Sequence, residues 1–237
     1  KEIEPSVARL ILAMVACLYG TNYATVKVME GVLEPSNLLA LRFGLASLAF
    51  LPALSGASFE VLLAGAEIGV YAILAYASQA WALRMLPTSE LALTGSLAVL
   101  VVPLFDHISG RRRACPATIL AAILACGGAA VLQAAGELSG GKIGGATMWD
   151  HALSLLQPIF FGLSTWRMEA HATRYPGQAP ALTAGQVMMA AVSSALWSIV
   201  AGDCSSRVPE AFAHPLSDPG ALAITLWLGL VTTALVM

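Results

Sequence analysis

The chain has 237 residues, of which 58% are hydrophobic and only 11% are charged. Soluble domains carry about 25% charged residues, so this composition excludes a water-soluble globular protein and indicates a membrane protein. The formal net charge of −2 gives no reason to expect a nucleic-acid partner.

Apolar segments follow one another along the whole chain. In order, they cover residues 7–28, 37–54, 61–83, 89–105, 117–135, 152–172, 182–201 and 221–237. A hydrocarbon core about 30 Å thick is crossed by roughly 20 helical residues, because each residue rises about 1.5 Å. The third and fourth segments form a hairpin around Pro87, which cannot donate a backbone hydrogen bond. The sequence therefore predicts an all-α, polytopic transmembrane helix bundle.

Two features concern the ends of the chain. The last segment is apolar up to Met237, so we expect the sequence to be cut short.

Lysine and arginine are unevenly divided between the two sides of the predicted bundle. In membrane proteins the cytoplasmic loops carry the excess of these residues. The side of the N-terminus holds Lys1, Arg9, Arg111, Arg112, Arg113, Arg167 and Arg174, and the other side holds Lys27, Arg84, Lys142 and Arg207. This bias predicts a cytoplasmic N-terminus.

The two halves of the chain share a weak internal similarity. Residues 17–20 (CLYG) resemble 159–162 (IFFG), and 68–70 (IGV) resemble 228–230 (LGL). If residues 1–137 form one repeat of five helices, residues 138–237 form a second repeat with three of its five. An odd number of helices inverts one repeat relative to the other in the membrane, as in many secondary transporters.

A family resemblance rests on short motifs in a fixed order. Tyr19-Gly20 near the end of the first segment is followed by Leu41-Arg42-Phe43, Ala75-Tyr76, Leu86-Pro87-Thr88 and Val102-Pro103-Leu104. This order resembles the EamA-like branch of the drug/metabolite transporter superfamily. The resemblance implies ten helices in two inverted five-helix repeats around a central solute cavity, so about eight of ten helices are present here. Two departures, Tyr19 before the glycine and Ser109-Gly110-Arg111 after the fourth segment, leave the substrate undefined.

Polar residues inside the apolar segments are the candidates for solute binding. An unpaired polar group is costly in the bilayer, and side chains three or four residues apart share a helix face. The predicted substrate-binding residues are Asn22, Tyr23, Arg42, Tyr76, Gln79, Thr94 and Trp166, of which Trp166 depends on the repeat.

Each candidate has a structural alternative. Arg42 is explained slightly better by an interfacial ion pair with Glu30 or Glu34 than by an anionic solute. Asn22 and Gln79 are explained equally well by hydrogen bonds to neighbouring helices. The Thr94 hydroxyl is equally explained by a hydrogen bond to the backbone of the preceding helical turn. The pair Gly65 and Gly69 predicts close helix packing rather than function.

The segments contain no catalytic or metal-binding motif and no nucleotide-binding loop, so we expect no enzyme, cofactor or metal site. The sequence predicts an integral, multi-pass transporter of small organic solutes that works by alternating access and is driven by a gradient or by exchange. The alternatives are a non-transporting scaffold or assembly subunit and, less favoured, an intramembrane enzyme. The expected partners are a small-molecule solute and the lipid bilayer, with a homodimer as a candidate assembly.

Overall fold

The computed structural model describes residues 4–111, 148–201 and 218–235, with scattered positions between 116 and 131. Its elements in chain order are α1 (Pro5–Met29), α2 (Pro35–Leu54), α3 (Phe59–Met85), α4 (Thr88–Ser96), α5 (Ala98–Ile108), α7 (Met148–Arg174), α8 (Ala179–Val200), α10 (Pro219–Leu226) and the π-helix η1 (Trp227–Leu235). The predicted segment 117–135 lies largely outside the described residues.

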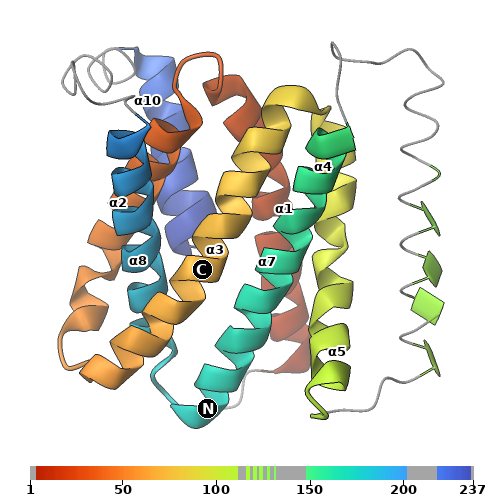
Figure 1. The fold of residues 1–237 in the computed structure, drawn as a ribbon. Helices are drawn as coiled ribbons and strands as arrows, with labels where there is room; N and C mark the ends of the chain where they lie inside the picture. The colour runs from red at the N-terminus through yellow and green to blue at the C-terminus, as the bar shows by residue number, and fades with distance from the viewer. Residues whose placement is uncertain are drawn as a thin grey trace.

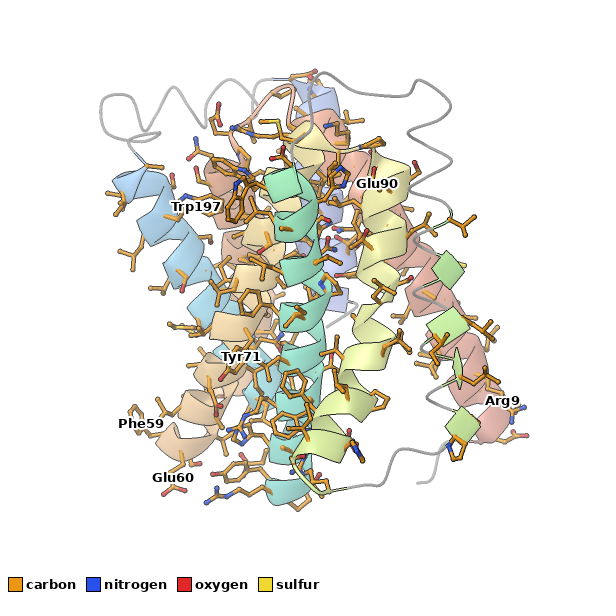
Figure 2. The ribbon with its side chains drawn as sticks, turned by 45° about the vertical axis from the view of Figure 1, so that its right-hand side comes forward. Arg9, Phe59, Glu60, Tyr71, Glu90 and Trp197 are labelled. Carbon is orange, nitrogen blue, oxygen red and sulfur yellow. The ribbon has the colours of Figure 1, made fainter. Side chains whose placement is uncertain are left out.

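The described helices lie roughly along one common axis and form one bundle (Figure 1). The long helix α3 packs against α8 and α7, while α8 also packs against α2 and α7 against α5. Glu90 and Trp197 lie near one end of the bundle, and Arg9, Phe59 and Glu60 lie near the other (Figure 2). We call the end at which α1 begins the N-terminal end. The chain is an all-α polytopic bundle, as the sequence predicts.

The outer surface of the bundle exposes many large apolar side chains, and its interior holds polar side chains among apolar ones. Leu48, Leu63 and Leu196 are each more than half exposed, whereas Asn22 is completely buried. Helices long and apolar enough to cross a membrane are Arg9–Met29, Pro35–Leu54, Phe59–Met85, Thr88–Ile108 and Ala179–Val200. The exposed apolar side chains and these helices identify an integral, multi-pass membrane protein.

The helix ends follow from local sequence chemistry. Pro35 occupies the first turn of α2, where a missing N–H costs nothing, and Pro87 separates α3 from α4. Asp218 caps α10 by accepting hydrogen bonds from the backbone N–H groups of Gly220 and Ala221. Gly56 follows α2 with φ 90°, a conformation that a side chain would strain.

Two predicted segments are not continuous α-helices. The segment 89–105 is divided at Leu97, where Leu97 N–H bonds to Thr94 O at 3.1 Å in a tighter, 3₁₀-type turn. The segment 221–237 changes at Trp227 from α-helix to π-helix, and Thr233 Oγ1 bonds back to Leu228 O five residues earlier. The sequence analysis gave these segments only as apolar spans, and the structure adds the change of helix geometry within each of them.

Glycines set the closest helix contacts, as predicted for Gly65 and Gly69. A Cβ on Gly65 would clash with the Leu182 carbonyl oxygen of α8, and one on Gly69 would lie 2.6 Å from Gln186 O. Gly185 of α8 returns the contact, because a Cβ there would lie 2.6 Å from Leu62 O in α3. Small residues therefore hold α3 and α8 with their backbones touching.

Candidate functional site

Tyr76 of α3 is the point at which four helices meet. Its hydroxyl lies 3.2 Å from the Tyr19 hydroxyl of α1, and the Arg42 guanidinium of α2 lies 4.6 Å from the centre of its ring. Phe43 of α2 and Phe161 of α7 contact the same ring edge-on, with centroids 5.1 and 4.8 Å away. Tyr76 itself is 2% exposed. An aromatic and cationic centre is thereby enclosed inside the bundle.

Arg42 is deeply buried rather than interfacial. It is 1% exposed, and its Nε donates a hydrogen bond to Thr233 Oγ1 of η1 at 2.5 Å. The favoured sequence interpretation, an ion pair with Glu30 or Glu34, is wrong, because Glu30 pairs with Lys27 and Glu34 pairs with Arg84. Arg42 stands seven residues into α2, about 10 Å from the helix start, whereas both acids lie at the helix ends.

A second polar level lies one helical turn from Tyr76. Gln157 of α7 donates a hydrogen bond to the Tyr23 hydroxyl at 2.5 Å. Gly95 of α4 makes room for this pair, because a Cβ there would overlap the Tyr23 hydroxyl and lie 3.0 Å from Gln157 Nε2. This contact is a physical reason for a glycine at position 95, in the middle of a membrane helix.

Asn22 and Gln79 complete that level. Helices α1 and α3 run side by side, since Tyr19 meets Tyr76 and Lys27 Nζ donates to Leu83 O, so the two amides lie at similar heights. Asn22 is fully buried and Gln79 is 2% exposed. Within the described residues, neither side-chain amide has a hydrogen-bond partner. We name the set Tyr19, Asn22, Tyr23, Arg42, Tyr76, Gln79 and Gln157 the central polar cluster.

The remaining two predicted residues behave differently. Thr94 is buried next to Gly95, and its hydroxyl bonds to Glu90 O at 3.0 Å, which is the alternative weighed for it. Trp166 is separate from the central polar cluster. Its Nε1 donates a hydrogen bond to Asp106 Oδ1 at 2.9 Å. Trp166 follows Phe161 by five residues, which places it about 7.5 Å further along α7. Among the described residues, no hydrogen bond or ring contact joins Trp166 to Gln79 or to another member of the central polar cluster, so nothing supports the expectation that Trp166 faces the same site.

Sequence reasoning did not assign Thr232 and Thr233, both completely buried in η1. Thr233 carries the hydrogen bond to Arg42 across the bundle. The two adjacent threonines inside an otherwise apolar run are the signal that could have found them.

A second group of polar residues lies toward the N-terminal end of the bundle. Glu67 of α3 is 2.6 Å from Arg167 Nη2, and its other oxygen is 2.9 Å from His171 Nε2, both on α7. We call these three residues the terminal ion-pair cluster. Glu67 and His171 line a groove of about 730 Å³, together with Arg174, Tyr175 and Met189. The cluster joins α3 to α7 by charge.

The EamA-like transporter family profile matches residues 8–133, more than half of the chain. The chain belongs to the EamA-like transporter family. No curated protein and no solved structure matches it. Members of this family are membrane transporters of small solutes, not enzymes, so the central polar cluster of this EamA-like protein is a candidate solute site.

Proposed function

We propose that this protein carries small organic solutes across a bilayer by alternating access, driven by a solute gradient or by exchange. The solute binds in the central polar cluster. The observation that carries the proposal is the pair of buried amides, Asn22 and Gln79, which have no partner among the described residues. A buried amide without a partner costs about 1–3 kcal/mol, so a purely structural role would leave that cost unpaid.

The packing of the two chain halves supports a repeat architecture, with residues 1–137 as the first repeat and 138–237 as the second. Gly69 of α3 meets the Gln186 carbonyl of α8, and Gly229 of η1 meets the Arg42 carbonyl of α2. Tyr19 and Phe161, which correspond in the proposed repeats, both contact Tyr76. Reciprocal contacts of this kind are expected of two units related by a pseudo-twofold axis in the membrane.

Polar links at the two ends of the bundle supply the gates for alternating access. Toward the N-terminal end, Glu67 of α3 joins Arg167 of α7. Near the other end, His151 of α7 lies 2.9 Å from Glu90 of α4. In the proposed division, each link joins the first repeat to the second. Opening one end requires its link to break while the other holds, which alternates access to the centre.

The orientation proposed from charge places the N-terminal end in the cytoplasm. Among the described residues, Arg9, Arg111, Arg167 and Arg174 lie toward that end, and Lys27 and Arg84 lie toward the other. This division supports a cytoplasmic N-terminus by the positive-inside bias.

Solute exchange by the purified full-length protein in proteoliposomes tests the function. The panel contains amino acids, sugars, sugar phosphates and nucleotide-linked sugars, and the variant is Gln79→Leu. The matched control is Trp81→Leu, on the same helix but 47% exposed on the outer surface.

We expect exchange of at least one solute class that Gln79→Leu abolishes at normal protein yield and Trp81→Leu preserves. Absence of exchange across the panel by well-folded protein would contradict the transporter proposal and favour a scaffold subunit. A scaffold would also tolerate the apolar replacement of Gln79 without functional loss.

A further inference from the structure

We infer that the solute held in the central polar cluster carries an oxyanion, a carboxylate or phosphate group, and that Arg42 binds it. This inference rests on the proposed function and specifies its substrate class.

Among the residues that the structure describes, no acid pairs with the buried cation Arg42. Ion pairs among the described residues include Lys27 with Glu30, Arg84 with Glu34, and Arg167 with Glu67, and the histidines His171 and His151 lie beside Glu67 and Glu90. None of these pairs includes Arg42. Two acids in the described part of the chain are also buried, and both have partners: Asp106 accepts from Trp166 at the end of α5, and Glu30, whose side chain is 8% exposed, pairs with Lys27. A buried charge that lacks a counter-charge is strongly unfavourable, so an anion has a large gain from binding here.

The neutral partners of Arg42 hold its guanidinium without neutralising it. Thr233 accepts from Nε, and the Tyr76 ring covers one face of the guanidinium plane at 4.6 Å. Among the described atoms, Nη2 is buried with no hydrogen-bond partner. The planar arrangement of guanidinium N–H groups matches carboxylate and phosphate oxygens, so the unpartnered nitrogen presents a suitable donor.

The rest of the central polar cluster is neutral. Its hydroxyl and amide groups belong to Tyr19, Asn22, Tyr23, Tyr76, Gln79 and Gln157. The Asn22 and Gln79 amides can donate to an oxyanion and accept from a solute hydroxyl with their oxygens. The cluster therefore presents one positive charge surrounded by neutral hydrogen-bonding groups. That combination favours a polar organic molecule with an oxyanion at one end.

The test compares solute pairs that differ in charge at one group. Proteoliposomes with the full-length protein are given gluconate against gluconamide and glucose 6-phosphate against glucose. The variants are Arg42→Gln, which keeps length and polarity, and Arg42→Lys, which keeps the charge without the planar fork. Arg84→Gln is the control, since Arg84 pairs with the exposed Glu34 at a helix end.

We expect uptake of at least one oxyanion-bearing solute and not of its neutral counterpart. The carboxylate and phosphate pairs show which oxyanion is accepted. Arg42→Gln should lower that uptake by about 10- to 100-fold, the range expected for loss of a hydrogen bond to a charged group. Arg42→Lys should lower it less, and Arg84→Gln should leave it unchanged.

Two results would overturn the inference while leaving the transporter function intact. One is uptake of a neutral solute as fast as its oxyanion counterpart. The other is undiminished oxyanion uptake by correctly folded Arg42→Gln. If that variant does not fold, the solute pairs with the unchanged protein and with Arg42→Lys still decide the question.

Absence of any uptake would count against the proposed function, and a binding measurement then decides the inference separately. Oxyanion-bearing solutes should raise the melting temperature of the purified protein in detergent, and this shift should vanish in Arg42→Gln. No shift with any of the oxyanions would overturn the inference.

Discussion

The central polar cluster and the terminal ion-pair cluster both bridge α3 and α7, but they treat polar groups in opposite ways. In the terminal cluster, the Glu67 carboxylate faces both Arg167 and His171, so the charges are matched within the protein. In the central cluster, Asn22, Gln79 and Arg42 Nη2 are buried without described partners. Matched charges hold two helices together, whereas unmatched groups have binding capacity left for another molecule.

The largest expected loss of stability comes from removing the Tyr76 side chain at the centre of the central polar cluster. Tyr76→Ala deletes a buried ring that contacts Arg42, Phe43 and Phe161, and should destabilise the protein by about 3–5 kcal/mol. Thermal unfolding in detergent measures the loss. Tyr71→Ala, on the same helix but only half-buried, is the control and should cost much less. Equal losses in the two variants would show that the Tyr76 contacts add nothing special.

The next largest loss of stability is expected from displacing α3, the helix that contributes to both clusters. Gly65→Ala places a Cβ against the Leu182 backbone, and overpacking of this kind should cost about 1–3 kcal/mol. Gly44→Ala is the matched control, because a Cβ at Gly44 meets no atom within 4 Å of the described structure. A lower melting temperature for Gly65→Ala alone is expected. If both variants unfold like the parent protein, the close α3–α8 contact is not needed.

A smaller loss of stability is expected from a change in the terminal ion-pair cluster, and its effect on transport distinguishes a gate from a solute site. Glu67→Gln removes the charge that holds Arg167 and His171, and should cost roughly 1 kcal/mol or less because the site is partly exposed. In the transport assay, it should change the maximal rate and leave half-saturation unchanged, since a gate does not touch the solute. Glu60→Gln, an exposed acid in the first turn of the same helix, should change neither. A shift in half-saturation for Glu67→Gln would assign that residue to the solute site instead.

The smallest effect concerns pH, at the end of the bundle opposite to the N-terminal end. Burial raises the pKa of Glu30 above its ordinary value, and the ion pair with Lys27 opposes this only in part. A raised pKa means that the folded protein prefers protonated Glu30. Stability should therefore be highest below the ordinary pKa and fall as the pH rises through the raised value. Melting temperatures across this range should fall less in Glu30→Gln, and identical profiles would contradict the assignment.

Several structural features could be predicted because they follow from local chemistry. The break at Pro87, the glycine contact between α3 and α8, and the burial of Asn22 and Gln79 each need only a helix in a bilayer. The pairing of Arg42 could not be predicted. Glu30 and Glu34 are close to Arg42 in sequence, but Arg42 donates its hydrogen bond to Thr233, 191 residues later. The hydrogen bond of Trp166 could not be predicted for a similar reason, because its partner Asp106 lies on another helix.

The sequence by itself determined the class of this protein. A chain with 58% hydrophobic residues, arranged in runs long enough to cross a bilayer, must satisfy its backbone within helices and turn its apolar side chains to lipid. Only the tertiary structure decided which polar groups are paired. Pairing depends on which helix faces meet, and those faces are set by contacts such as Gly69 with Gln186 and Gly229 with Arg42. The unpartnered groups at the centre are visible only once the helices are packed.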